Sequence, residues 1–97
     1  MTRLSDQHLW SLRNEVPIDD VIRKLDLPAK EVEGYFRFLC PACAEFHTAT
    51  QPRTNLARCF RCQQNYNPID LVMTVRKASF LQAVRYLTQN FGQHLSD

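Results

Sequence analysis

The spacing of apolar residues predicts helices in the first third of the chain. An apolar stripe at i, i+3, i+4 and i+7 runs through residues 18–25. Pro17 suits the first turn of this helix because it has no N–H to leave unpaired there. A shorter helix is expected upstream, capped by Ser5 and reaching Asn14. Together these segments form an N-terminal helical arm over residues 1–30.

Two further helices are expected downstream, in residues 67–92. Asn67 can cap the first, Pro68 occupies its first position, and Asp70 suits the positive end of a helix. Ser79 opens the second helix, which should stop near the glycine at position 92. The apolar face of this last helix is made of Phe80, Val84, Leu87 and Phe91.

The middle of the chain has the aromatic-rich alternation of short β-strands. Residues 35–40, 46–50 and 56–60 are three strand candidates, and a turn at residues 51–55 joins the last two. Phe36 and Phe38 would share one face of the first strand. Since large aromatics usually carry buried area, both are expected in the core.

Four cysteines lie in this middle segment as two close pairs. Two residues separate Cys40 from Cys43 and Cys59 from Cys62, and fifteen residues separate the pairs. The short gap lets both sulfurs of one tight turn reach the same ion, and a hairpin brings back the second pair to complete a tetrahedron. We therefore predict one structural zinc ion held by all four thiolates.

Other interpretations of the cysteines stay open. They could be two redox pairs of the thioredoxin type, buried structural thiols, or ligands of iron in a rubredoxin-like site. Neither pair lies between a strand and a helix of a βαβ unit, which disfavours the redox interpretation. His47 lies four residues after Cys43 and could replace one cysteine, although the set is complete without it.

These patterns predict an α+β fold, with a small zinc ribbon flanked by N-terminal and C-terminal helices. The ribbon, a three-stranded antiparallel sheet, should occupy residues 35–66. The 97 residues, with 44% hydrophobic and 23% charged positions, suit one globular domain over residues 1–97. No apolar run reaches the roughly 18 residues of a membrane span, and no secretory signal is recognisable. We expect a cytoplasmic protein without a membrane partner.

The charge is unevenly distributed along the chain. Residues 1–34 carry five Lys or Arg and seven Asp or Glu, whereas residues 35–97 carry seven and three. Arginine side chains fit phosphate, and exposed aromatic rings can stack on unpaired bases. Phe36, Phe46 and Tyr66 are candidates for such stacking. The predicted nucleic-acid-binding residues are Tyr35, Arg37, His47, Arg53, Arg58, Phe60 and Arg61.

Five segments of the chain carry a family resemblance. They are residues 16–22, 35–43, 59–62, 67–73 and 79–84. In sequence and order they resemble the CHC2-type zinc-binding domain of bacterial DnaG-type primases. That family usually has a histidine where this chain has Cys43, and tetrahedral zinc accepts either ligand. The family also has glycines just after the second pair. This chain has none there, but its Asn65 can adopt the left-handed conformation that a glycine would supply.

The resemblance implies binding of a single-stranded template and selection of primer start sites, with polymerisation left to a separate catalytic domain. Phosphoryl transfer needs clustered carboxylates to hold metal ions, and only Asp70 and Asp97 follow Cys62. We predict a non-catalytic zinc module that binds nucleic acid, mainly single-stranded DNA, in a replication, primase-like or mobile-element setting. The alternatives are an adaptor that docks a replication protein partner and the zinc-binding part of a longer primase.

Overall fold

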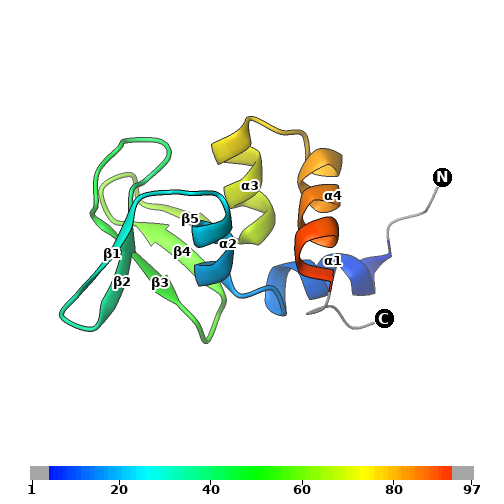
Figure 1. Ribbon diagram of the computed structural model, residues 1–97, viewed down its shortest axis with the longest axis horizontal. Helices are drawn as coiled ribbons and strands as arrows, with labels where there is room; N and C mark the ends of the chain where they lie inside the picture. Colours follow the sequence, from blue (N-terminus) through cyan, green and yellow to red (C-terminus); the bar gives the residue numbers. More distant parts are fainter. Residues whose placement is uncertain (1–4, 93–97) are drawn as a thin grey trace.

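The computed structural model describes residues 5–92, with four helices and five strands (Figure 1). In chain order they are α1 (Asp6–Asn14), α2 (Ile18–Lys24), β1 (Ala29–Val32), β2 (Tyr35–Phe38), β3 (Thr48–Gln51), β4 (Leu56–Cys59), β5 (Gln64–Tyr66), α3 (Pro68–Arg76) and α4 (Phe80–Phe91). The molecule is elongated, with the strands at one end and α1 and α4 at the other. None of the described helices is long and apolar enough to cross a bilayer.

The helices of the N-terminal arm begin where the sequence predicts. The Ser5 side chain caps α1 by accepting a hydrogen bond from the backbone N–H of His8 at 3.0 Å. Pro17, predicted in the first turn, is the cap residue that precedes α2. The helix buries Ile18 and two further apolar side chains of the predicted stripe, Val21 and Ile22. The arm ends sooner than expected, however, because the chain enters β1 at residue 29.

The two C-terminal helices start with capping boxes, as their sequences indicate. At α3, Asn67 accepts from the Asp70 N–H at 2.8 Å and Asp70 accepts from the Asn67 N–H at 3.2 Å. Ser79 and Gln82 make the same reciprocal pair at α4. One expectation is corrected: Phe80 is 37% exposed because it sits in the first turn of α4, and the face buried against the core contains Ala83, Val84, Leu87 and Phe91.

The first strand predicted for the ribbon forms a separate hairpin instead. β2 pairs with β1, antiparallel, with Lys30 opposite Arg37 and Val32 opposite Tyr35. The two-residue turn between them is Glu33 and Gly34, both with positive φ, which is the requirement of the tight type I′ hairpin turn. The residues of β2 therefore belong to a two-stranded sheet.

The three-stranded antiparallel sheet has the order β3-β4-β5. Two of its strands overlap the predicted segments 46–50 and 56–60, and the third is Gln64–Tyr66 in place of residues 35–40. Thr48 faces Cys59, and Cys59 faces Gln64, so the register ties the second cysteine pair to both neighbouring strands. The predicted α+β class, with a three-stranded antiparallel sheet flanked by helices, is confirmed.

Thr48 connects the two sheets through its side chain. Its hydroxyl accepts a hydrogen bond from the Phe38 N–H at 2.8 Å and donates to the Phe38 carbonyl. Arg37 adds a third link, since its Nη1 donates to the Thr48 carbonyl at 2.8 Å. β2 is thus held beside β3 by side-chain bonds, where a regular ladder would use backbone groups.

Helix α3 lies at the centre of the hydrophobic core. It packs against α1, α2, α4 and β5, so the N-terminal helices, the C-terminal helices and the three-stranded sheet share one apolar interior. Phe38 is fully buried as predicted, whereas Phe36 is partly buried with the Arg23 guanidinium 4.7 Å from its ring centroid. The buried cluster contains Leu12, Val16, Ile18, Val21, Ile22, Phe38, Ala57, Tyr66, Ile69, Leu71, Val72, Ala83, Val84, Leu87 and Phe91.

Candidate metal centre and nucleic-acid interface

The two cysteine pairs converge on one point. All four sulfur atoms lie within 4.8 Å of one another, with 3.9 Å between Cys40 and Cys62 and 3.7 Å between Cys43 and Cys59. Because Zn–S bonds are about 2.3 Å long, the sulfurs of a tetrahedral zinc site lie about 3.8 Å apart. The described residues therefore fit one zinc ion, with every tetrahedral position filled by protein.

Each pair occupies a tight turn that ends in a left-handed residue. Ala44, with φ 58°, follows the first pair, and its N–H donates to the Cys40 carbonyl at 2.9 Å. Gln63, also with φ 58°, follows the second pair, in which the Cys62 N–H donates to the Cys59 sulfur at 3.4 Å. The left-handed residue after the second pair is therefore Gln63, whereas the sequence suggested Asn65.

The site is asymmetric between core and solvent. Cys40 and Cys59 are buried, whereas Cys43 and Cys62 are partly exposed. The Tyr66 hydroxyl lies 3.9 Å from the Cys40 sulfur, and the Tyr66 side chain is only 3% exposed. Tyr66 therefore lines the inner side of the metal site and has no face open for stacking on a base.

Burial and neighbouring thiols oppose the ionisation of Cys43 and Cys62 when no cation is present. Burial raises the pKa of the Cys40 thiol, but N–H groups of Cys43 and Ala42 and neighbouring thiols outweigh burial and lower the pKa to about 7. The Cys43 thiol, followed by burial, raises the pKa of Cys62 to about 12, and burial raises the pKa of Cys43. A divalent ion supplies the charge that lets all the sulfurs bind as thiolates.

Three of the predicted nucleic-acid-binding residues meet on the sheet face turned away from the buried Cys59. Arg58 lies opposite Ala49 in the register, and its guanidinium is 5.8 Å from the ring centroid of Phe60. The Phe60 N–H donates to the His47 carbonyl at 2.8 Å, so these two residues lie opposite each other. We call His47, Arg58 and Phe60 the ribbon face.

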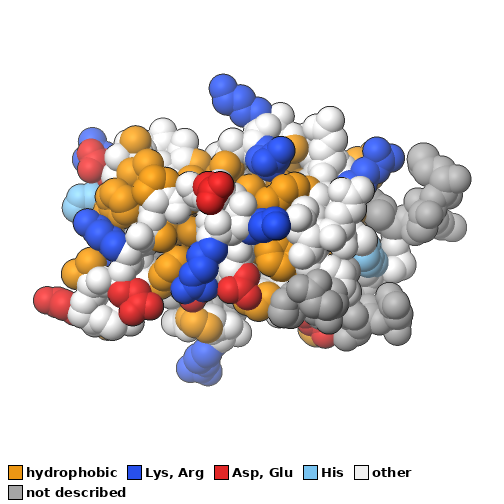
Figure 2. All heavy atoms as spheres, in the orientation of Figure 1, with side chains coloured by type: hydrophobic (Ala, Val, Ile, Leu, Met, Phe, Trp, Pro, Cys, Tyr) orange, Lys and Arg blue, Asp and Glu red, His pale blue; other side chains and the backbone are white. Residues whose placement is uncertain are grey.

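The ribbon face is open to solvent. Phe60 is 55% exposed and His47 is exposed, whereas Arg58 is partly covered and donates from Nη1 to Asn65 Oδ1 at 3.2 Å. Arg61 is exposed in the turn between Cys59 and Cys62, next in sequence to Phe60. Figure 2 shows hydrophobic, basic and histidine side chains together over the strand-bearing end of the molecule, with acidic side chains nearby.

Tyr35 and Arg37 lie on the neighbouring hairpin. The Arg37 guanidinium lies 5.7 Å from the Tyr35 ring centroid, and Tyr35 is 58% exposed. The bond from Arg37 to Thr48 places this pair along the border of β3. Lys30 lies opposite Arg37 on β1, and its Nζ is 4.5 Å from the centroid of the Phe46 ring. Lys30 is not identifiable from the sequence alone, because the local sequence pattern does not predict β1.

Arg53 is separated from the other predicted residues. It lies in the turn between β3 and β4, whereas His47 and Phe60 flank the opposite end of the same hairpin. Its N–H donates to Gln51 Oε1 at 3.3 Å and its side chain is exposed. The structure therefore groups six of the seven predicted residues around the strands and the second cysteine turn, with Arg53 at the far end.

The fold and the four-cysteine cluster define a zinc-ribbon protein with one structural zinc. The chain belongs to the CHC2 zinc finger family, whose model matches residues 4–97. It is also similar to a DNA primase of Streptomyces coelicolor, with 29% identity over 92 residues. This similarity covers 93% of the chain but 14% of the primase, so the chain corresponds in length to a fragment of that protein. The resemblance predicted from the sequence is confirmed.

Proposed function

We propose that this chain is a zinc-binding module that binds single-stranded nucleic acid, primarily DNA, in primase-type replication. The observation that carries the proposal is the ribbon face, where the exposed ring of Phe60 lies beside the Arg58 guanidinium and the Phe60 backbone bonds to that of His47. We further propose that residues 1–97 act as one domain, in the cytoplasm, without catalytic activity of their own.

The chemistry of the ribbon face suits an unpaired strand. The exposed ring of Phe60 offers a stacking surface for a base, and stacking requires bases that are not already paired in a duplex. Arg58 and Arg61 offer planar donors for the phosphates on either side. The zinc ion would hold the Cys59–Cys62 turn, and with it Phe60 and Arg61, in a fixed position. The metal therefore contributes structure, and the exposed side chains contribute recognition.

A second candidate is the zinc-binding part of a longer primase. The relative with 29% identity is a primase, and the chain spans 14% of its length. In that setting the module would present the template strand to a catalytic domain elsewhere in the protein. The same ribbon face would serve both candidates, so one binding experiment tests their shared content.

The decisive measurement is fluorescence anisotropy of a labelled single-stranded oligonucleotide at two salt concentrations, with zinc-loaded protein. Binding should weaken with salt at a log–log slope of about −3 if Arg37, Arg53, Arg58 and Arg61 each contact one phosphate. Changing Arg58 and Arg61 together to alanine should weaken binding about 10-fold or more and leave the zinc content unchanged. A matched control removes Arg13 and Lys24, two exposed basic residues on α1 and α2, and should change binding little.

Two results would contradict the proposal. Absence of binding even at low salt would favour the adaptor hypothesis, in which the ribbon docks a replication protein. Equal weakening by the Arg58/Arg61 variant and the Arg13/Lys24 control would show that binding follows net charge and does not use the ribbon face.

A further inference from the structure

An open groove of about 400 Å³ lies between the end of α3 and the outer face of α4. It is remote in sequence from the ribbon and includes none of the residues proposed above for nucleic-acid binding. Its lining includes Val72, Arg76, Ala78, Gln82, Arg85 and Tyr86. With Gln89, two apolar side chains and five side chains with N–H or O–H donors thus surround one concavity.

The surroundings of the groove are basic. From Leu71 to Gly92 the sequence contains three Lys or Arg and no Asp or Glu. Within residues 5–92 the structure has one ion pair, between Arg23 and Asp20. Within these residues, therefore, neither Arg76 nor Arg85 pairs with a carboxylate. In Figure 2, basic side chains lie above and between the positions that α3 and α4 have in Figure 1. Among the residues that the structure describes, no carboxylate therefore balances the positive charge of the groove by direct contact.

Two of the donor groups are held in place. The Arg76 guanidinium lies 5.0 Å from the ring centroid of Tyr86, a cation–aromatic contact that orients the planar group while its N–H edges stay available. The Gln82 oxygen accepts a hydrogen bond from the Ser79 N–H at 2.9 Å, which leaves the amide NH₂ as a donor. Part of the donor set is thus ordered before any ligand arrives, which lowers the entropy cost of binding.

Tyr86 adds a hydroxyl donor to the wall of the groove. Burial raises the pKa of the Tyr86 hydroxyl, Arg76 acts in the opposite direction, and Asp26 raises it further. The hydroxyl therefore stays protonated at neutral pH and can donate a hydrogen bond. Asp26 follows α2, and its negative charge influences the Tyr86 hydroxyl less than the positive charge of Arg76 does.

We propose that this groove binds a phosphate group through Arg76 and Arg85, with Gln82 and Tyr86 as additional donors. Guanidinium forks match phosphate oxygens in pairs, and a set of donors without a paired acid suits an anion. The phosphate belongs either to a free nucleotide or to the backbone of a nucleic acid. The apolar part of the groove, at Val72 and Ala78, offers a surface for the attached sugar in both cases.

The test uses zinc-loaded protein and amide chemical shifts measured by NMR. Three probes are titrated separately: inorganic phosphate, a nucleoside triphosphate and a short single-stranded oligonucleotide. At least one should shift the amides of residues 76–86. Changing Arg76 and Arg85 together to alanine should weaken that response at least 10-fold, whereas the Arg13/Lys24 control should preserve it. Arg85→Ala alone, which keeps the Arg76–Tyr86 contact, should weaken it at least 3-fold.

The probes separate the two sources of phosphate. A response to the triphosphate and to inorganic phosphate supports a nucleotide site, and a response to the oligonucleotide alone supports a backbone site. No shift at residues 76–86 with any probe, or an unchanged response in the Arg76/Arg85 variant, overturns the proposal. The Arg58/Arg61 variant should retain the groove response to the triphosphate, so failure of the ribbon-face proposal is distinguishable from failure of this one.

Discussion

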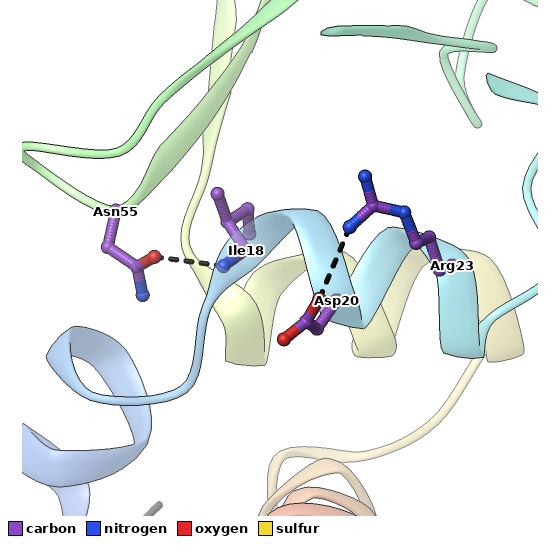
Figure 3. Close-up of polar contacts among 4 residues, drawn as sticks. All are labelled: Ile18, Asp20, Arg23 and Asn55. Carbon is purple, nitrogen blue, oxygen red and sulfur yellow. Dashed lines mark hydrogen bonds and ion pairs between the residues drawn. The ribbon is translucent and has the colours of Figure 1, made fainter. Parts of the chain in front are cut away.

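Asn55 accepts a hydrogen bond from the backbone N–H of Ile18 at 2.9 Å, across 37 positions of sequence (Figure 3). Its amide nitrogen donates to the carbonyls of Arg13 and Val16 at 2.8 and 2.6 Å. Pro17, the cap residue of α2, makes no side-chain cap bond. From the turn between β3 and β4, Asn55 therefore supplies the cap that the helix lacks locally, and it holds the connection between α1 and α2 against this hairpin.

Replacing Asn55 with alanine should destabilise the folded protein by about 2–3 kcal/mol. Three backbone groups would lose their partner in a site where Asn55 is only 7% exposed, and each such loss costs about 1 kcal/mol or more. Alanine would also have to adopt φ 56°, which asparagine tolerates better. The measurement is denaturant unfolding of the zinc-loaded protein.

Asp20→Ala is the matched control, because Asp20 lies on α2, the helix that Asn55 caps, and makes an exposed ion pair with Arg23 at 3.2 Å (Figure 3). Exposed pairs and first-turn acids contribute little, so the loss should stay below about 1 kcal/mol. An Asn55→Ala protein as stable as Asp20→Ala would show that the long-range cap has no energetic role.

The helix starts were predictable because their causes are local. Ser5, Asn67 and Ser79 each bond to an N–H three residues ahead, so the pattern that produces the helix is visible in a window of four residues. The metal site was predictable for a similar reason, because the two-residue spacing of each pair is itself the geometry of the turn. Both features depend on neighbours along the chain.

The missed features depend on distant partners. β1 is exposed at all four positions and has no apolar alternation, and β5 has only three residues, so neither carries a recognisable strand pattern. Without knowledge of β1, the pattern of residues 35–40 predicts a strand of the ribbon sheet. The bonds of Thr48 to Phe38 and of Asn55 to Ile18 join positions that no local pattern relates. The ribbon face follows from the register of β3 and β4, which the sequence does not specify.

Zinc affinity should rise steeply with pH. Without metal, the pKa of Cys62 is raised to about 12 and that of Cys43 is also raised, so both thiols are protonated at pH 7 to 8. Binding them as thiolates releases at least two protons, which means an affinity gain of about 100-fold or more per pH unit. Below the Cys40 pKa of about 7 a third proton adds to this dependence.

The sign for folding follows from the same protons. In the unfolded chain the cysteine thiols have a pKa of about 8.5, whereas the zinc-bound state holds them as thiolates. The stability that zinc binding contributes is therefore lost as pH falls. Competition with a chelator of known affinity at pH 6.5, 7.5 and 8.5 measures the effect. A zinc affinity that is the same at the three pH values would contradict the assignment of these cysteines as thiolate ligands.

Glycine at the left-handed positions should stabilise the cysteine turns. Ala44 and Gln63 both have φ 58° and exposed side chains, and a left-handed conformation costs a residue with a Cβ about 1–2 kcal/mol. Glycine avoids this cost but loses about 0.4–1 kcal/mol through the greater freedom of the unfolded chain. Ala44→Gly and Gln63→Gly should each raise the free energy of unfolding by about 0.5–1 kcal/mol.

Ala42→Gly provides the control within the same turn. Ala42 is exposed like Ala44 but is not among the described residues with positive φ, so glycine there should lower stability by about 0.5–1 kcal/mol. Unfolding is measured for zinc-loaded proteins at equal metal content. Shifts of the same sign for Ala42→Gly and Ala44→Gly would show that backbone strain does not distinguish the two positions.

Phe60→Ala should weaken binding of a single-stranded oligonucleotide by about 1–3 kcal/mol, the usual contribution of one base stacked on an aromatic ring. The variant should keep its zinc, because the hydrogen bond from Phe60 to the His47 carbonyl uses the Phe60 backbone N–H, which alanine retains. Trp10→Ala is a matched control, since Trp10 is 52% exposed on α1 and Phe60 is 55% exposed beside the zinc site. Phe60→Trp should retain binding because a larger ring preserves the stacking surface. Anisotropy titrations of the three variants decide the matter: equal affinities for Phe60→Ala and Trp10→Ala would remove the aromatic contribution from the ribbon face and leave only its charge.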